Sequence, residues 1–186
     1  MKILFRSLAT IAAFAAAVTL ALPQPVAAAS AAELTRDAQK ALNALYAKNP
    51  GAKSIGQNAV AILVFPEVIK AGLGVGGQFG EGVLFRGGKA VGYYNTAGAS
   101  VGLQAGAQKY GYAMFFLSEE NLKYLDKSEG FEVGVGPSVV VADKGMATSP
   151  KTTTTMKDKI YAFIFDQGGA MYALGIQGNK ITKIKK

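Results

Sequence analysis

The chain has 186 residues, of which half are hydrophobic, and its 20 basic and 12 acidic residues give a formal net charge of +8. It contains no histidine and no cysteine, which excludes disulfides, imidazole- or thiol-based catalysis and most zinc sites. A chain of this length is expected to form one domain of ordinary size.

The first 29 residues have the features of a secretory signal peptide. Lys2 and Arg6 precede an apolar stretch over residues 11–22, and three alanines at 27–29 stand before Ser30. The apolar stretch is too short for a membrane span. We therefore expect an exported protein, periplasmic or secreted, with a single domain over residues 30–186. Loss of Lys2 and Arg6 lowers the net charge from +8 to +6. A modest positive charge on an exported protein favours anionic lipid, polysaccharide or lipid phosphate as a partner over nucleic acid.

A helix is predicted to begin at Ser30, because Ser30 and Glu33 have the spacing of a capping box. Its apolar positions fall on one face, and Pro50-Gly51 should end it. This face could lie in a membrane interface or pack on a sheet, and its alanine content favours packing. A short helix or turn is expected over 52–57. The apolar run 59–65 is predicted to be a buried strand or the end of a buried helix.

The rest of the chain is predicted to be mostly strands with one inserted helix. Strands are expected over 70–85, 90–96, 99–109, 112–117, 131–142, 159–166, 170–176 and 181–184, and a short helix from Ser118 to about Lys127. Gly87-Gly88 suits a two-residue hairpin turn, and residues 143–156 form a polar loop. The predicted fold class is α+β: an antiparallel, glycine-rich meander of about seven or eight strands that curls into a barrel or half-barrel.

Thirteen of the 23 glycines lie between residues 72 and 111, and many occupy alternate positions. A period of two is typical of a strand, and a strand face made of glycine indicates that something approaches the backbone closely. The pattern V-G-x-Q-x-G occurs at 75–80 and again at 101–106. We expect these faces to line a groove formed by Gly72, Gly74, Gly76, Gln78, Gly80, Gly102, Gln104 and Gly106.

Three motifs typical of enzymes or ligand sites are weak here. Gly72-x-Gly74-x-x-Gly77 matches a dinucleotide fingerprint but is not followed by a helix-forming sequence. Ser100 stands in a G-x-S-x-G pattern, but the chain has no histidine to act as its base. Glu81 is an isolated acid among glycines. No enzyme activity, cofactor or metal is therefore expected, and a hydrolase using Ser100 is kept only as a hypothesis to test.

The segment A-V-A-I-L-V-F-P-E-V-I-K-A-G-L-G-V-G-G-Q-F-G-E-G-V-L at 59–84 resembles the SYLF domain family. The segments A-S-V-G-L-Q-A-G-A-Q at 99–108 and G-F-E-V-G at 130–134 carry the same resemblance, which extends over about 34–184. It implies lipid binding, since eukaryotic relatives bind phosphoinositides through basic residues and a helix, and some relatives bind actin. Lys70 and the glycine face after it are the positions that match.

The leading hypothesis is an exported, non-enzymatic protein that binds anionic phospholipid or lipid phosphate at a membrane surface. An acyl chain would enter the glycine groove, and basic side chains would attract the headgroup: Lys70, Arg86, Lys89 and Lys109. The alternative is a small transmembrane β-barrel of the outer membrane, which the length, glycine content and alternation permit. Solubility without detergent distinguishes the two.

Overall fold

The computed structural model describes residues 29–126, 130–133, 139–141, 160–169 and 178–186. The expected signal peptide, the polar loop over 143–156, and the strand expected over 170–176 lie outside these residues. Within them, the helices are α1 (Ala31–Lys48), α2 (Pro50–Gln57), α3 (Glu119–Lys123) and the 3-10 turn η1 (Tyr124–Asp126). The strands are β1 (Ala61–Arg86), β2 (Lys89–Phe116), β3 (Phe131–Glu132), β4 (Val139–Val141), β5 (Ile160–Gly169) and β6 (Lys180–Ile184).

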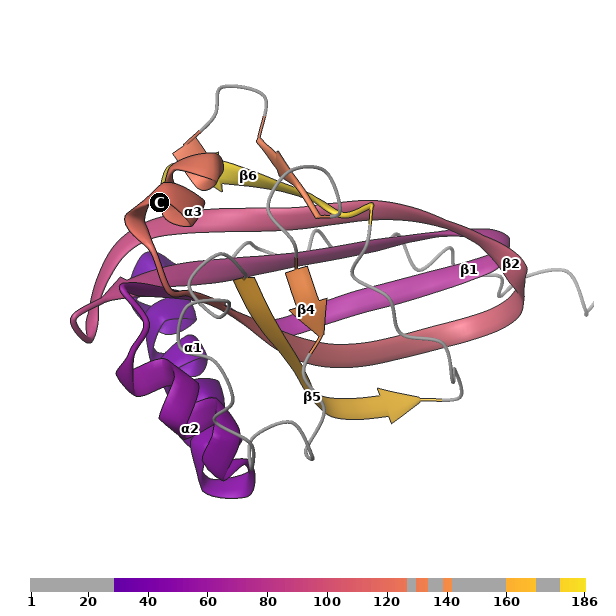
Figure 1. Ribbon diagram of the computed structural model, residues 1–186. Coiled ribbons are helices and arrows are strands. Elements are labelled where there is room, and N and C mark those ends of the chain that lie inside the picture. Colours follow the sequence, from indigo (N-terminus) through magenta and orange to yellow (C-terminus); the bar gives the residue numbers. More distant parts are fainter. Residues whose placement is uncertain (1–28, 127–129, 134–138, 142–159, 170–177) are drawn as a thin grey trace, which may run out of the picture.

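The described strands form one sheet that curls into a half-barrel, as the sequence predicts (Figure 1). Its order is β3-β6-β2-β5-β4, with β1 paired to β2. All pairs are antiparallel except β4 with β5, which is parallel. The order is not that of a simple meander, because β2 is long enough to pair with β6 along its first half and with β5 along its second half.

Two very long strands replace the several shorter ones that the sequence predicts. β1 has 26 residues and β2 has 28, and they pair from Ala61 opposite Phe116 to Arg86 opposite Lys89. The predicted turn is confirmed, because Gly87 and Gly88 connect the strands with φ angles of 55° and 78°. Register shifts interrupt the pairing, and Pro66 lies at one of them, where a missing N–H is tolerated.

The hairpin folds back on itself between Leu73 and Val75, where one of these register shifts lies. A β-carbon added at Gly80 would lie 2.6 Å from the carbonyl oxygen of Glu67, and one at Gly82 would lie 2.6 Å from the ring of Phe65. The second half of β1 is therefore in direct contact with the first half. Figure 1 shows the hairpin turning back at the end of the molecule farthest from α1 and α2. We call residues 68–80 of β1 and 97–109 of β2 the folded end.

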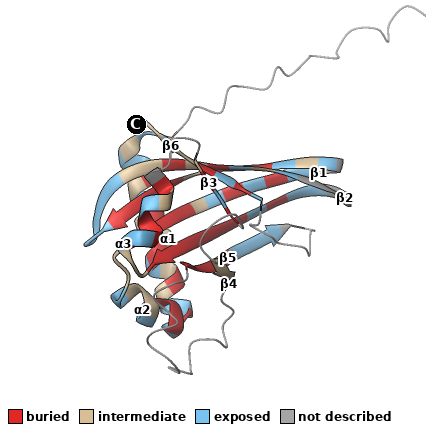
Figure 2. Ribbon diagram, turned by 45° about the horizontal axis from the view of Figure 1, so that its top comes forward, coloured by how far each residue is buried: buried red, intermediate tan, exposed pale blue. Residues whose placement is uncertain are grey.

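The folded hairpin separates two hydrophobic clusters. The inner cluster lies between the two layers of the hairpin and contains large side chains from both strands, including Phe65 and Tyr112, whose rings stack with centroids 4.7 Å apart. The outer cluster lies beneath α1 and joins it to β1, β2 and β5. Figure 2 shows buried residues concentrated toward the helix end of the hairpin.

Helix α1 begins as its sequence predicts. The backbone N–H of Glu33 donates to the Ser30 hydroxyl at 3.3 Å, and the Ser30 N–H donates to the Glu33 carboxylate at 3.0 Å. The apolar stripe is buried against the sheet through Leu34, Ala38, Leu42 and Leu45. Of the two uses proposed for this face, packing on the sheet is therefore the one observed.

The remaining predictions of secondary structure meet with mixed outcomes. The run from 59 is a strand that begins at Ala61, and the turn or helix near 52–57 is α2, for which Asn49 is the N-cap. The inserted helix is shorter than expected and ends at Lys123, followed by η1. Of the strand expected over 131–142, the described residues form only β3 and β4.

Candidate functional site

The first pair of predicted headgroup residues lies at the folded end, on opposite faces of the sheet. Lys70 pairs in register with Gln108 on the inner face, and it is only 7% exposed. Lys109 projects from the outer face and forms an ion pair with Glu67 at 2.9 Å, with both side chains more than half exposed. Only Lys109 of this pair is presented to solvent.

The second pair lies at the other end of the hairpin. Arg86 and Lys89 are opposite each other beside the turn, and Arg86 forms an ion pair with Glu119. Arg86 lies eleven positions after Val75 at the fold, or roughly 35 Å along an extended strand. The four predicted cations therefore do not form a single site.

The predicted glycine face is covered by the protein itself at two of its positions. A β-carbon at Gly72 would lie 2.7 Å from the Val75 carbonyl oxygen, and one at Gly80 would lie 2.7 Å from the Val68 side chain. These glycines therefore make room for the folding of β1 rather than for an acyl chain. Gly106 has a φ of 146° and open space around it. Gly76 is half-buried, and the surroundings of Gly74, Gly102 and Gln104 lie outside the described residues.

Gln78 belongs to a buried polar cluster on the inner face. The Tyr110 hydroxyl donates to Gln78 Oε1 at 2.7 Å, and Gln78 Nε2 donates to Asn179 Oδ1. Beside them, the Tyr112 hydroxyl bonds Thr96 Oγ1 at 2.8 Å. Burial raises the pKa of Tyr110 to about 12 and also raises the pKa of Tyr112. The cluster joins β1 and β2 to the residue that precedes β6.

Two side-chain atoms of this inner face have no hydrogen-bond partner among the described residues: Gln108 Oε1 and Asn179 Nδ2. Both residues are almost fully buried, at 3% and 0% exposure. Each atom can bind an ordered water or a polar group. Sequence reasoning found Gln78 and missed Asn179. The spacing of Gln108, Tyr110 and Tyr112 at alternate positions of one strand was the available signal, because alternate residues share a face.

Exposed apolar side chains gather at the folded end. Of the four large hydrophobic residues that are exposed in the described part of the chain, three lie in this part of β1: Ile69 at 46%, Val75 at 70% and Phe79 at 53%. The fourth, Val91 at 53%, lies near the hairpin turn. The sequence does not reveal this distribution. Strand periodicity assigns side chains to two faces but does not say which face is covered.

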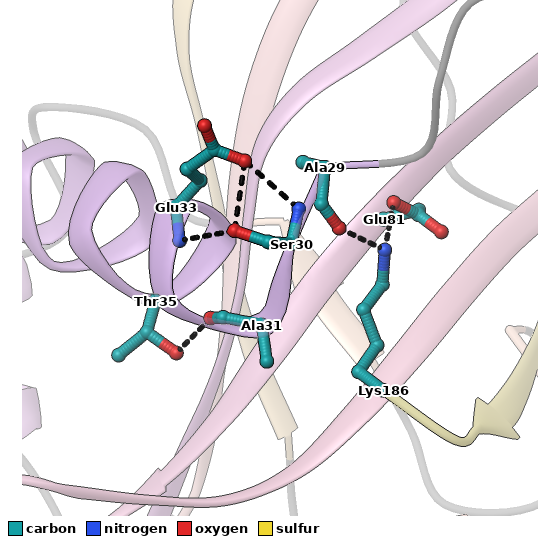
Figure 3. A network of polar contacts seen from close by, with 7 residues as sticks. All are labelled: Ala29, Ser30, Ala31, Glu33, Thr35, Glu81 and Lys186. Atoms are coloured by element: carbon teal, nitrogen blue, oxygen red, sulfur yellow. Dashed lines mark hydrogen bonds and ion pairs between the residues drawn. The ribbon is translucent and has the colours of Figure 1, made fainter.

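Glu81, the isolated acid of the glycine segment, is part of a structural network. Lys186 Nζ lies 2.7 Å from the Glu81 carboxylate and 2.6 Å from the carbonyl oxygen of Ala29 (Figure 3). The Lys186 and Glu81 side chains are 8% and 19% exposed. Ala29 directly precedes the capping box of Ser30 and Glu33, so Lys186 connects β1, through its ion pair with Glu81, to the start of α1, through its hydrogen bond to Ala29.

Little else in the described residues indicates catalysis or metal binding. No group of three or more acidic side chains is placed to hold a metal ion there. The side chain of Ser100 lies outside the described residues. No described helix combines the length and hydropathy required to cross a bilayer.

Residues 97–186, just under half of the chain, match the family model Ysc84, described as "Las17-binding protein actin regulator". The matched region runs from the folded end of β2 to the last residue and includes Gln108, Tyr110, Tyr112 and Asn179. No curated protein matches the chain. The family match agrees with the resemblance carried by the motifs.

Proposed function

Because residues 97–186 match this family model and the motifs resemble the SYLF family, we propose an exported, non-enzymatic protein that binds the surface of anionic membranes. The ligand is anionic phospholipid or lipid phosphate. Lipid association is inferred from the family. Actin is not proposed as a partner, because an exported protein does not meet actin. Export itself rests on the signal peptide expected over residues 1–29.

The observation that carries the proposal is a group of exposed lysines in β6 and directly after it. Lys180, Lys183 and Lys185 are all exposed, and β6 pairs directly with β2 through Ala97 to Tyr93. Lysines near an anionic bilayer contribute about 1 kcal/mol each. Lys89 and Lys109, two of the predicted headgroup residues, are also exposed, at the two ends of the hairpin.

Vesicle co-sedimentation tests the proposal. The mature protein is expected to sediment with vesicles that contain phosphatidylglycerol and to remain in solution with pure phosphatidylcholine vesicles, and added salt is expected to weaken binding. The double variant Lys180→Glu and Lys185→Glu should bind at least thirtyfold more weakly, which corresponds to about 2 kcal/mol for two lysines.

The matched control is the double variant Lys40→Glu and Lys53→Glu. These lysines are also exposed but lie on α1 and α2, so the change in net charge is the same while the lysines of β6 and the last residues stay unchanged. Equal losses in both variants would mean that net charge alone matters. Binding that ignores lipid charge would overturn the proposal.

A further inference from the structure

We propose that the outer face of the folded end is a membrane anchor, with Val75 and Phe79 entering the interfacial region of an anionic bilayer. This inference rests on the proposed lipid-binding function and names the part of the molecule that performs it. The exposed apolar area, the arrangement of small residues around it and the local charge each support it.

The first support is exposure. Val75 is 70% exposed and Phe79 is 53% exposed, although both lie in the longest hairpin of the protein. Ile69, on the same segment, is 46% exposed. Large apolar side chains that gather in one exposed place mark an interaction surface, whereas single ones are ordinary.

The second support is the flatness of the surface around these side chains. Phe79 lies opposite Ala97, and Gly77 lies opposite Ala99, and all four residues are exposed. Among the described residues, a β-carbon placed at Gly77 would have one neighbour within 4 Å, the Gly98 carbonyl oxygen at 3.8 Å. The aromatic ring therefore stands beside small residues, free to enter a lipid surface.

The third support is charge, and it identifies the occupant. Neither strand segment of the folded end contains a carboxylate. Of its two lysines, Lys70 is buried on the inner face, and Lys109 is exposed and pairs with Glu67, which directly precedes the folded end. Lys109 lies opposite Ile69. Lys180 of β6 lies between Ala97 of β2 and Glu132 of β3, one strand away from Phe79. A second copy of the chain would bring its own lysines against these. An anionic bilayer accepts the apolar side chains and attracts the exposed ammonium groups of Lys109 and Lys180.

The depth of entry is limited by the backbone. The N–H and C=O groups that face each other between β1 and β2 are paired. An unpaired strand edge, by contrast, would be costly in hydrocarbon. The side chains of Val75 and Phe79 therefore reach the interface between headgroups and acyl chains, while the strands stay at headgroup level.

The chain contains no tryptophan, so one introduced tryptophan reports the depth of a single position. Phe79→Trp and Val91→Trp are a matched pair, because both native side chains are 53% exposed and lie at opposite ends of the hairpin. With phosphatidylglycerol vesicles, the emission of the Phe79→Trp variant is expected to shift to shorter wavelength and to be quenched by brominated acyl chains. The emission of the Val91→Trp variant is expected to change in neither respect.

A second variant tests affinity. Val75→Asp with Phe79→Asp should reduce vesicle binding at least tenfold and leave thermal unfolding unchanged, since both sites are exposed, whereas Val91→Asp should bind as the native protein does. If the Phe79→Trp variant sediments with vesicles without a shift in emission, the anchor is refuted and the lipid-binding function stands. If the native protein does not sediment, the function fails and the anchor with it. If the double Asp variant instead converts a dimer into a monomer in size-exclusion chromatography, the surface binds a second copy and the membrane assignment is overturned.

Discussion

Replacing Gly80 with alanine tests the central feature of the fold, which is the contact between the two halves of β1. The added β-carbon would lie 2.6 Å from the Glu67 carbonyl oxygen, 2.7 Å from the Val68 side chain and 3.1 Å from the Val68 Cα. These atoms belong to backbone and to a stiff β-branched side chain, so the strand itself must shift. Overpacking of this kind costs about 1–3 kcal/mol.

Gly80→Ala is therefore expected to lower the midpoint of thermal unfolding by roughly 2–12 °C, at about 2–4 °C per kcal/mol for a domain of this size. Circular dichroism during heating measures the midpoint. Gly82→Ala should behave alike, because its β-carbon would lie 2.7 Å from the Val64 carbonyl oxygen.

Gly77→Ala is the control on the same strand. Its β-carbon would have a single neighbour within 4 Å in the part of the chain that the structure describes, at 3.8 Å. We therefore expect a change within about 0.5 kcal/mol, or a stabilisation of up to about 1 kcal/mol from the restricted unfolded chain. If Gly80→Ala and Gly82→Ala were as stable as Gly77→Ala, the folding of β1 onto itself would be refuted.

Four further variants test the buried Tyr110 hydroxyl, the Lys186–Glu81 ion pair with an exposed pair as its control, and the N-cap of α1. The folded pKa of Tyr110 is raised from 10 to about 12, so its contribution to stability is complete below pH 10 and is lost as the pH rises toward 12. The free energy of urea unfolding should therefore differ less between pH 8 and pH 11 for Tyr110→Phe than for the native protein. Equal differences would contradict this. Lys186→Met leaves the mostly buried Glu81 carboxylate without its ion-pair partner and should lower the free energy of urea unfolding by about 1–3 kcal/mol. Arg36→Met removes an exposed pair and should lower it by less than about 0.5 kcal/mol. Similar losses in the two variants would argue against the network. Ser30→Ala removes the N-cap acceptor of α1 and should cost about 1 kcal/mol, and an unchanged urea midpoint would show that the cap is dispensable.

Some parts of the fold were predictable because neighbouring residues determine them. Local signals predict three of these features: the capping box of Ser30 and Glu33, the turn at Gly87-Gly88, and the last strand, which ends at Ile184. The α+β class and the curled, glycine-rich sheet also follow, since alternation and turn residues act over a few positions. The family resemblance comes from the sequence too, because its motifs are contiguous segments.

Other features required the tertiary structure. The sequence indicates that something approaches the glycine face, but only the coordinates identify part of that partner as the first half of the same strand, at Gly80 and Gly82. Lys70, expected to face a headgroup, lies on the inner face because the register of β1 with β2 puts it beside Gln108.

The sequence by itself therefore determined which segments are extended, where the chain turns and what its overall charge is. Tertiary structure alone decided that β1 folds onto itself, that Asn179 joins Gln78 across 101 positions of sequence, and that Val75 and Phe79 stay uncovered. The physical reason is that strand periodicity assigns side chains to two faces but does not say what lies against either face. That depends on contacts between residues that are distant in the chain.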